Sequence, residues 1–170
     1  MTLKPPVQAD SLKETMEAAY RILSIRSRSE EELKEKLKQR GFRAGTIDQA
    51  VSSLREKGYL NDAEFSLNFA RHLIRTRRYG LIRIEEELRK KGIPSGILRD
   101  TINNLTGEID EKAMVVNALE VRLRRSNFAS MDEKGKRKIM QYLFRKGFSL
   151  TTIYEVLKSR KWNIIENDRN

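Results

Sequence analysis

One six-residue pattern occurs three times along the chain and constrains its fold more than any other feature. Each copy has a leucine, two variable residues, a basic residue, a glycine and a large apolar residue, at residues 37–42, 88–93 and 143–148. Such self-similarity is the signature of a repeat protein, in which one supersecondary unit is copied along the chain. We therefore expect three copies of one structural unit.

The residues around each copy follow a helical period. Four positions before each leucine lies another branched apolar residue, on the same helical face (Leu33, Ile84 and Ile139). Eight positions before it lies a residue suited to an N-cap (Ser29, Gly80 and Gly135), and Ser29 with Glu32 forms a capping-box pattern. The glycine of each pattern predicts a helix C-terminus, because glycine adopts the left-handed conformation without strain. Apolar residues at helical spacing then predict a further helix after it.

A longer amphipathic segment precedes each helix pair, so the predicted unit has three helices. Its first helices are expected over residues 11–26, 62–78 and 110–125. The repeats are predicted at residues 11–60, 61–107 and 108–165, with flexible tails at 1–10 and 166–170. Ser130 and Glu133 form another capping box, so the middle helix of the third repeat is expected to begin about a turn early. The predicted fold is all-α, with three tandem three-helix repeats forming an elongated, curved, solenoid-like body.

The charge balance favours an acidic partner. The chain has 35 Lys and Arg residues against 24 Asp and Glu residues, a formal net charge of +11. That charge suits nucleic acid or an anionic protein surface. No segment approaches the roughly 18 apolar residues of a membrane span, and the first residues lack a secretory signal pattern, so we expect a cytoplasmic protein that binds no membrane. The absence of cysteine excludes disulfides and thiolate metal sites.

A more specific signature runs through the linker before the second repeat and the repeat itself. It consists of Gly-Tyr-Leu-Asn-Asp at 58–62, Phe65, Phe-Ala-Arg at 69–71, Arg-Arg-Tyr-Gly at 77–80, and residues 84–93. In order, spacing and repeat number, the chain resembles the RecX family over about residues 18–161. Gly96, Asn103 and the connection at 126–134 have no counterpart in the family pattern.

The resemblance to the RecX family implies a regulatory protein with neither enzymatic activity nor a cofactor. Family members bind RecA and RecA–single-stranded DNA filaments and inhibit or modulate RecA ATPase, strand exchange and recombination. The resemblance thus implies a role in DNA repair and the SOS response, and we expect a monomer. Charge alone leaves an alternative open, which is an autonomous nucleic-acid-binding helical repeat protein that contacts DNA directly and has no RecA partner.

Arginines gather near the end of the first helix of every repeat. Residues 65–84 contain no acid, and a helical wheel places Arg71, Arg75 and Arg78 opposite the apolar arc. The planar guanidinium suits phosphate and carboxylate partners. The predicted partner- or DNA-binding residues are Arg71, Arg75, Arg77, Arg78 and Arg83 in the second repeat, Arg26 and Arg28 in the first, and Arg122, Arg124 and Arg125 in the third. The alternative for each single arginine is a solvated charge near a helix C-terminus.

Other candidates point to structure rather than chemistry. The bases before the three glycines (Arg40, Lys91 and Lys146) are expected to serve helix ends, and Tyr59, Tyr79 and Tyr142 to pack in turns or the core rather than stack on bases. No phosphate-binding loop is present, and His72 is the only histidine, so a His-x-x-x-His metal pair is excluded. We predict no catalytic residue and no metal ligand.

Overall fold

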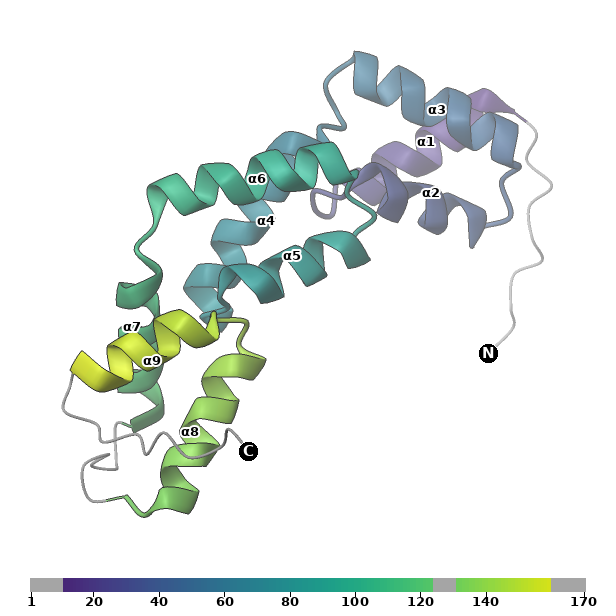
Figure 1. The fold of residues 1–170 in the computed structure, drawn as a ribbon. Helices are drawn as coiled ribbons and strands as arrows, with labels where there is room; N and C mark the ends of the chain where they lie inside the picture. Colours follow the sequence, from purple (N-terminus) through teal and green to yellow (C-terminus); the bar gives the residue numbers. More distant parts are fainter. Residues whose placement is uncertain (1–10, 124–130, 160–170) are drawn as a thin grey trace, which may run out of the picture. The chain divides into compact units, whose positions relative to one another are not determined.

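The computed structural model describes residues 11–123 and 131–159, which hold nine helices and no strand (Figure 1). The first three are α1 (Leu12–Leu23), α2 (Glu30–Lys38) and α3 (Ala44–Glu56). Then follow α4 (Asp62–Arg77), α5 (Leu81–Lys90), α6 (Ser95–Glu108), α7 (Glu111–Leu123), α8 (Glu133–Arg145) and α9 (Leu150–Ser159). The predicted all-α class, with three helices in each of three successive repeats, is confirmed. The two predicted tails lie outside the described residues.

The three motif glycines end helices in the left-handed conformation, as predicted. Their φ angles are 87° at Gly41, 71° at Gly92 and 85° at Gly147. After each glycine, the amide of the apolar residue donates to the carbonyl of the motif leucine, at N···O distances of 3.3, 3.3 and 3.4 Å. This bond satisfies a carbonyl that the end of the helix leaves open. The repeated sequence pattern is therefore a repeated helix C-cap.

The chain divides into two compact units, whose boundary runs through the second repeat. One unit comprises Met1–Phe69 with Leu88–Thr101, and the other comprises Ala70–Glu87 with Ile102–Asn170. Helices α4, α5 and α6 each place one end in one unit and the other end in the second unit. We refer to these as the first and second unit.

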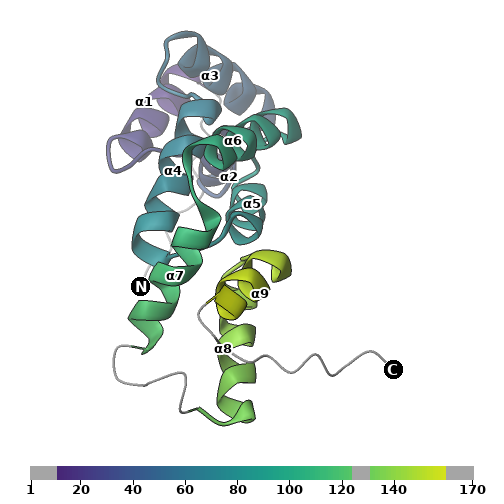
Figure 2. The ribbon, with the colours of Figure 1, turned by 60° about the vertical axis from the view of Figure 1, so that its left-hand side comes forward.

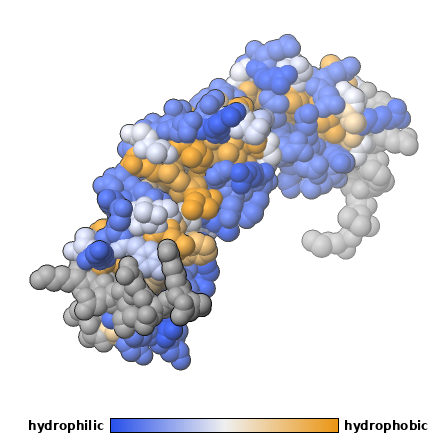
Figure 3. All heavy atoms as spheres, in the orientation of Figure 1, coloured by the Kyte–Doolittle hydropathy of each residue, from blue (hydrophilic) through white to orange (hydrophobic). Residues whose placement is uncertain are grey.

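Each unit has its own apolar core. In the first unit, α1, α2 and α3 lie together (Figure 1) and bury a cluster that includes Ile22, Leu33, Leu37 and Leu54. In the second, α7, α8 and α9 surround a cluster that includes Leu119, Leu143 and Phe148 (Figures 1 and 2). Hydrophilic side chains cover much of the face drawn in Figure 3, and apolar side chains show between them. The helical periodicity of the sequence thus corresponds to buried stripes.

The glycine turn of one repeat packs against the start of the middle helix of the repeat before it. In the first unit, Ser29 Oγ donates to the carbonyl of Lys91 at 2.5 Å. In the second, the amide of Gly80 donates to the carbonyl of Lys146 at 2.8 Å. We call these contacts the first joint and the second joint. A Cβ atom on Gly147 would overlap the backbone of Arg83, so close packing as well as the left-handed φ requires glycine there.

Two predictions about helix starts need correction. Ser29 caps α2, since its Oγ accepts the amide of Glu32 at 3.1 Å, but the carboxylate of Glu32 binds Arg26 and Lys91 and does not complete a capping box. Gly135 is not the N-cap of α8. Asp132 is the N-cap instead, and its Oδ1 accepts the amide of Gly135 at 2.8 Å. The early start of α8 is confirmed, whereas Ser130 lies outside the described residues.

Candidate functional site

The end of α4 presents exposed arginines, among them Arg71 and Arg75, which the helical wheel places outward; Arg78, the third arginine of that wheel, is only partly exposed. Phe65, Ala70 and Leu73 are buried, while Arg71, Arg75 and Arg77 are exposed. Both carboxylate oxygens of Glu108 accept from Arg71 Nη2 at 2.9 Å. The side chains of Arg75 and Arg77 have no hydrogen bond or ion pair with the described part of the chain. These two guanidinium groups are thus open to an external partner.

Arg78 and Arg83 are engaged within the second unit. Arg78 has a φ of 52°, so it ends α4 in the left-handed region, and its Nε donates to Asn117 Oδ1 at 3.1 Å. Arg83 binds Glu86 at 3.0 Å and Glu87 at 2.8 Å. Its Nε is buried and has no hydrogen-bond partner within residues 11–123 and 131–159. Both residues therefore hold the local structure together, and the predicted binding role for them stays a prediction.

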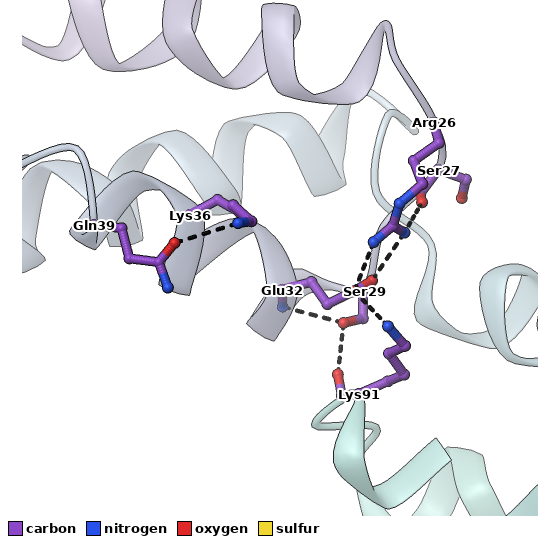
Figure 4. A network of polar contacts seen from close by, with 7 residues as sticks. All are labelled: Arg26, Ser27, Ser29, Glu32, Lys36, Gln39 and Lys91. Carbon is purple, nitrogen blue, oxygen red and sulfur yellow. Dashed lines mark hydrogen bonds and ion pairs between the residues drawn. The ribbon is translucent and has the colours of Figure 1, made fainter. Parts of the chain in front are cut away.

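In the first repeat, Arg26 belongs to a network of polar contacts around Glu32 (Figure 4), and Arg28 has no place in that network. Arg26 Nη2 lies 2.9 Å from Glu32 Oε1, and Lys91 Nζ lies 2.6 Å from the same oxygen. Burial alone would raise the pKa of Glu32, but the hydrogen bonds and charges of Arg26 and Lys91 outweigh it and lower the pKa to about 2. Arg28 is half-buried, and desolvation together with the charge of Arg26 lowers its pKa. The side chain of Lys91 serves this ion pair rather than a helix end.

In the third repeat, one of the three predicted arginines can be placed. Arg122 is exposed, and its guanidinium lies 5.4 Å from the centroid of the Tyr142 ring. Arg124 and Arg125 lie outside the described residues. A predicted arginine thus lies at the end of the first helix, or within three residues after it, in every repeat, and these arginines differ in what they bind.

Lys146 is a residue whose importance the sequence analysis underestimated. Its Nζ donates to the carbonyl of Arg77, the last residue of α4, at 2.7 Å. It therefore serves a helix end, but that of another repeat. The same ammonium lies 5.0 Å from the ring centroid of Tyr79 and 5.5 Å from that of Tyr142. Lys91 and Lys146 occupy the same position of the repeated motif, and each lies at a joint. This shared position is the sequence signal from which the role of Lys146 could be inferred.

Around Lys146 the surface is hollowed. The hollow has a volume of about 510 Å³ and mixes aromatic, apolar and charged side chains. They are Tyr79, Ile82, Arg83, Glu86, Tyr142, Phe144, Arg145 and Lys146, with Gly147. Phe144 is 56% exposed and Ile82 is 48% exposed. Desolvation and then the charges of Arg77 and Arg78 lower the pKa of Lys146. This combination of cations and aromatic rings suits an anionic partner that also offers apolar surface.

The described residues contain no cluster of three or more His, Cys, Asp or Glu side chains that could hold a metal ion. His72 is exposed on α4. None of the helices in residues 11–123 and 131–159 has both the length and the apolar character to cross a membrane.

Sequence models of three RecX domains match the chain in tandem order. The first three-helix domain matches residues 16–54, the second matches residues 61–102 and the third matches residues 115–157. The chain belongs to the RecX family. The RecX matches and the three sets of helices agree, so each repeat is a RecX three-helix domain.

Several RecX relatives are similar over most of their length. The protein named "Regulatory protein RecX" of Prosthecochloris aestuarii is 32% identical over 146 residues, which is 85% of this chain and 92% of the relative. The protein of the same name from Syntrophotalea carbinolica is 28% identical over 144 residues, 85% of this chain and 94% of the relative. Membership of this family implies a regulatory role.

The crystal structure of RecX from Lactobacillus salivarius has the same fold. It superimposes with a TM-score of 0.75 at 23% identity, and the match covers 88% of this chain and 96% of that one. A second RecX crystal structure gives a TM-score of 0.75 at 24% identity, over 87% and 73% of the two chains. The all-helical architecture is therefore that of solved RecX proteins.

Proposed function

We propose that this chain is a non-enzymatic regulator that binds RecA and RecA–single-stranded DNA filaments and inhibits or modulates RecA ATPase, strand exchange and recombination. The observation that carries the proposal is the match of all three RecX domains in order. The bacterial cytoplasm is then its place of action, and DNA repair and the SOS response are the processes it affects.

The surface of the second unit supports an anionic partner. Arg75 and Arg77 have exposed side chains without a hydrogen bond or ion pair among the described residues, and Arg83, Arg145 and Lys146 line a hollow in the same unit. Guanidinium groups that are not already paired bind phosphate or carboxylate without first breaking an internal ion pair. Arg75 and Arg77 are therefore the predicted arginines best placed for filament binding. Arg71 is already paired with Glu108, an exposed contact of small energy.

The test is RecA ATPase on single-stranded DNA, measured with increasing amounts of the full chain. We expect the ATPase rate to fall as the chain saturates the filaments. The double variant Arg75→Ala with Arg77→Ala should need a higher concentration for the same effect. Lys38→Ala with Arg21→Ala is a control with the same loss of charge, since these side chains are 74% and 79% exposed and lie in the first repeat. An unchanged ATPase rate at saturating wild-type protein contradicts the proposal.

The basic and aromatic hollow favours one alternative, an autonomous nucleic-acid-binding protein without a RecA partner. Such a protein would bind bare single-stranded DNA tightly, and its affinity would fall steeply with salt because each neutralised phosphate releases counterions. Binding to bare DNA and to preformed RecA filaments, compared at the same salt concentration, separates the two functions. Tight binding to filaments with weak binding to bare DNA would exclude the alternative.

A further inference from the structure

The two joints are built from the same positions of the repeat but differ in one charge. In the aligned repeats, Arg26 corresponds to Arg77, and Lys91 corresponds to Lys146. Glu32, which lies between the two cations of the first joint, corresponds to Arg83 in the second. The second joint therefore keeps the pair of cations and replaces the acid between them with a base.

In the first joint, the carboxylate of Glu32 forms ion pairs with both neighbouring cations. Its Oε1 lies 2.9 Å from Arg26 Nη2 and 2.6 Å from Lys91 Nζ (Figure 4). The Glu32 side chain is only 16% exposed, and that of Lys91 is 25% exposed. One oxyanion held between a guanidinium and an ammonium thus completes this joint.

In the second joint, no carboxylate of the described residues takes that place. The Arg83 side chain binds Glu86 and Glu87 on its own helix. Lys146 Nζ donates to a neutral backbone carbonyl, that of Arg77. No acidic side chain raises the pKa of Lys146, whereas Arg77 and Arg78 lower it after desolvation. Lys146 and Arg77, which correspond to the two cations that bind Glu32, therefore have no carboxylate partner in the part of the chain that the structure describes.

We propose that the second joint binds the oxyanion of a phosphate group between Lys146 and Arg77, in the place that the Glu32 carboxylate occupies in the first joint. A phosphate fits this place better than a carboxylate, because it carries more negative charge and Lys146 Nζ lies against the end of α4, where the two bases Arg77 and Arg78 follow one another. Arginine forms paired hydrogen bonds with phosphate oxygens, and lysine acts as a point charge toward them. The phosphate is either part of a nucleic-acid strand or a free phosphate ion. The inference does not depend on a RecA partner.

A bound phosphate would also strengthen the joint itself. Lys146 belongs to the third repeat and Arg77 to the second, so an anion that bridges them attaches one repeat to the other. Binding to the folded state alone raises the unfolding temperature as ligand concentration rises. The first joint needs no such ligand, because Glu32 is part of the chain.

The experiment compares thermal unfolding of the full chain in sodium phosphate and in sodium chloride at equal ionic strength. We expect phosphate to raise the midpoint of wild type. Lys146→Gln and Arg77→Gln should each weaken phosphate binding about tenfold, the usual effect of losing one charged hydrogen bond. Lys38→Gln, the matched control at a 74% exposed side chain, should respond as wild type does. An equal response of Lys146→Gln and wild type would overturn the proposal.

Restoring the acid provides a second, independent variant. Arg83→Glu places a carboxylate at the position of Glu32, and we expect it to abolish the phosphate response while the protein remains folded in chloride. If Arg83→Glu fails to fold, the comparison of Lys146→Gln with Lys38→Gln still decides the question. An undiminished phosphate response in a folded Arg83→Glu variant would count against the site.

Competition identifies the source of the phosphate. We measure the binding of a labelled oligothymidylate. If inorganic phosphate displaces it, and if Lys146→Gln binds it more weakly than wild type does, the site takes a nucleic-acid strand. Lys146→Gln could instead bind the oligothymidylate as tightly as wild type does and still lose its response to phosphate. That result shows that the site takes free phosphate. The assignment to phosphate would be overturned if a polyglutamate peptide bound wild type more tightly than either probe and if Lys146→Gln weakened that binding.

Discussion

The first joint allows a quantitative prediction for Glu32→Gln. The two cations lower the pKa of Glu32 from its ordinary value of 4.5 to about 2. Such a fall corresponds to about 3 kcal/mol of stability in the charged form. Arg26 is 47% exposed, so solvent screens part of this interaction. We therefore expect Glu32→Gln to lower the free energy of unfolding by about 2 kcal/mol at neutral pH.

The pH dependence follows from the same pKa. Because the folded pKa of Glu32 is depressed, its contribution is fully present above 4.5 and is lost as the pH falls through about 2. The difference between Glu32→Gln and wild type should therefore shrink over this range. Urea unfolding followed by circular dichroism at several pH values measures it.

Glu35→Gln is the matched control, since Glu35 lies on the same helix, is 51% exposed and is 3.8 Å from Lys38. An exposed pair of this kind contributes less than about 0.5 kcal/mol. If Glu32→Gln cost no more than Glu35→Gln at neutral pH, or if its cost did not change with pH, the ion pair would not stabilise the first joint.

Three further predictions concern stability. Gly147→Ala should destabilise the protein more than Gly58→Ala. Both glycines have a positive φ, but only a Cβ at position 147 would overlap the backbone of another residue, Arg83. Equal changes in the unfolding midpoint would contradict the described packing. Phe148→Ala removes a fully buried ring and should cost about 3–5 kcal/mol in urea unfolding, and a loss below about 1 kcal/mol would show that the core tolerates the cavity. Asp62→Asn should not destabilise the protein at neutral pH. Burial and the charge of Glu30 raise the pKa of Asp62, so the charged carboxylate is disfavoured, and an asparagine oxygen still accepts a hydrogen bond from the amide of Glu30. A large loss in the free energy of unfolding would show that the charge itself is needed.

Local features of the fold could be predicted from the sequence, because they depend on residues close together along a helix. The left-handed turn at Gly41 and the exposed side of α4 both follow from spacing and residue type. The start of α8 was harder to place, because Asp132 and Gly135 are both suitable N-caps and the side-chain bond from Asp132 decides between them.

The contacts at the joints could not be predicted in this way. Lys91 and Glu32 are 59 residues apart in sequence, and Lys146 and Arg77 are 69 residues apart. Their pairing depends on how one repeat packs on the next, which helical periodicity does not encode. The same limit applies to the arginines, because spacing alone does not distinguish Arg83, which binds two glutamates, from Arg75, which has no hydrogen bond or ion pair among the described residues.

The way in which the second repeat is shared between the two compact units has a consequence for synthesis on the ribosome. The first unit includes Leu88–Thr101, so it cannot complete its contacts when residue 69 has been made. The intervening segment, Ala70–Glu87, must then wait for residues beyond 102 before its own unit can form. A nascent chain halted between the repeats would therefore expose apolar surface from the unfinished middle, and both cores would be buried only once Leu157 has been made.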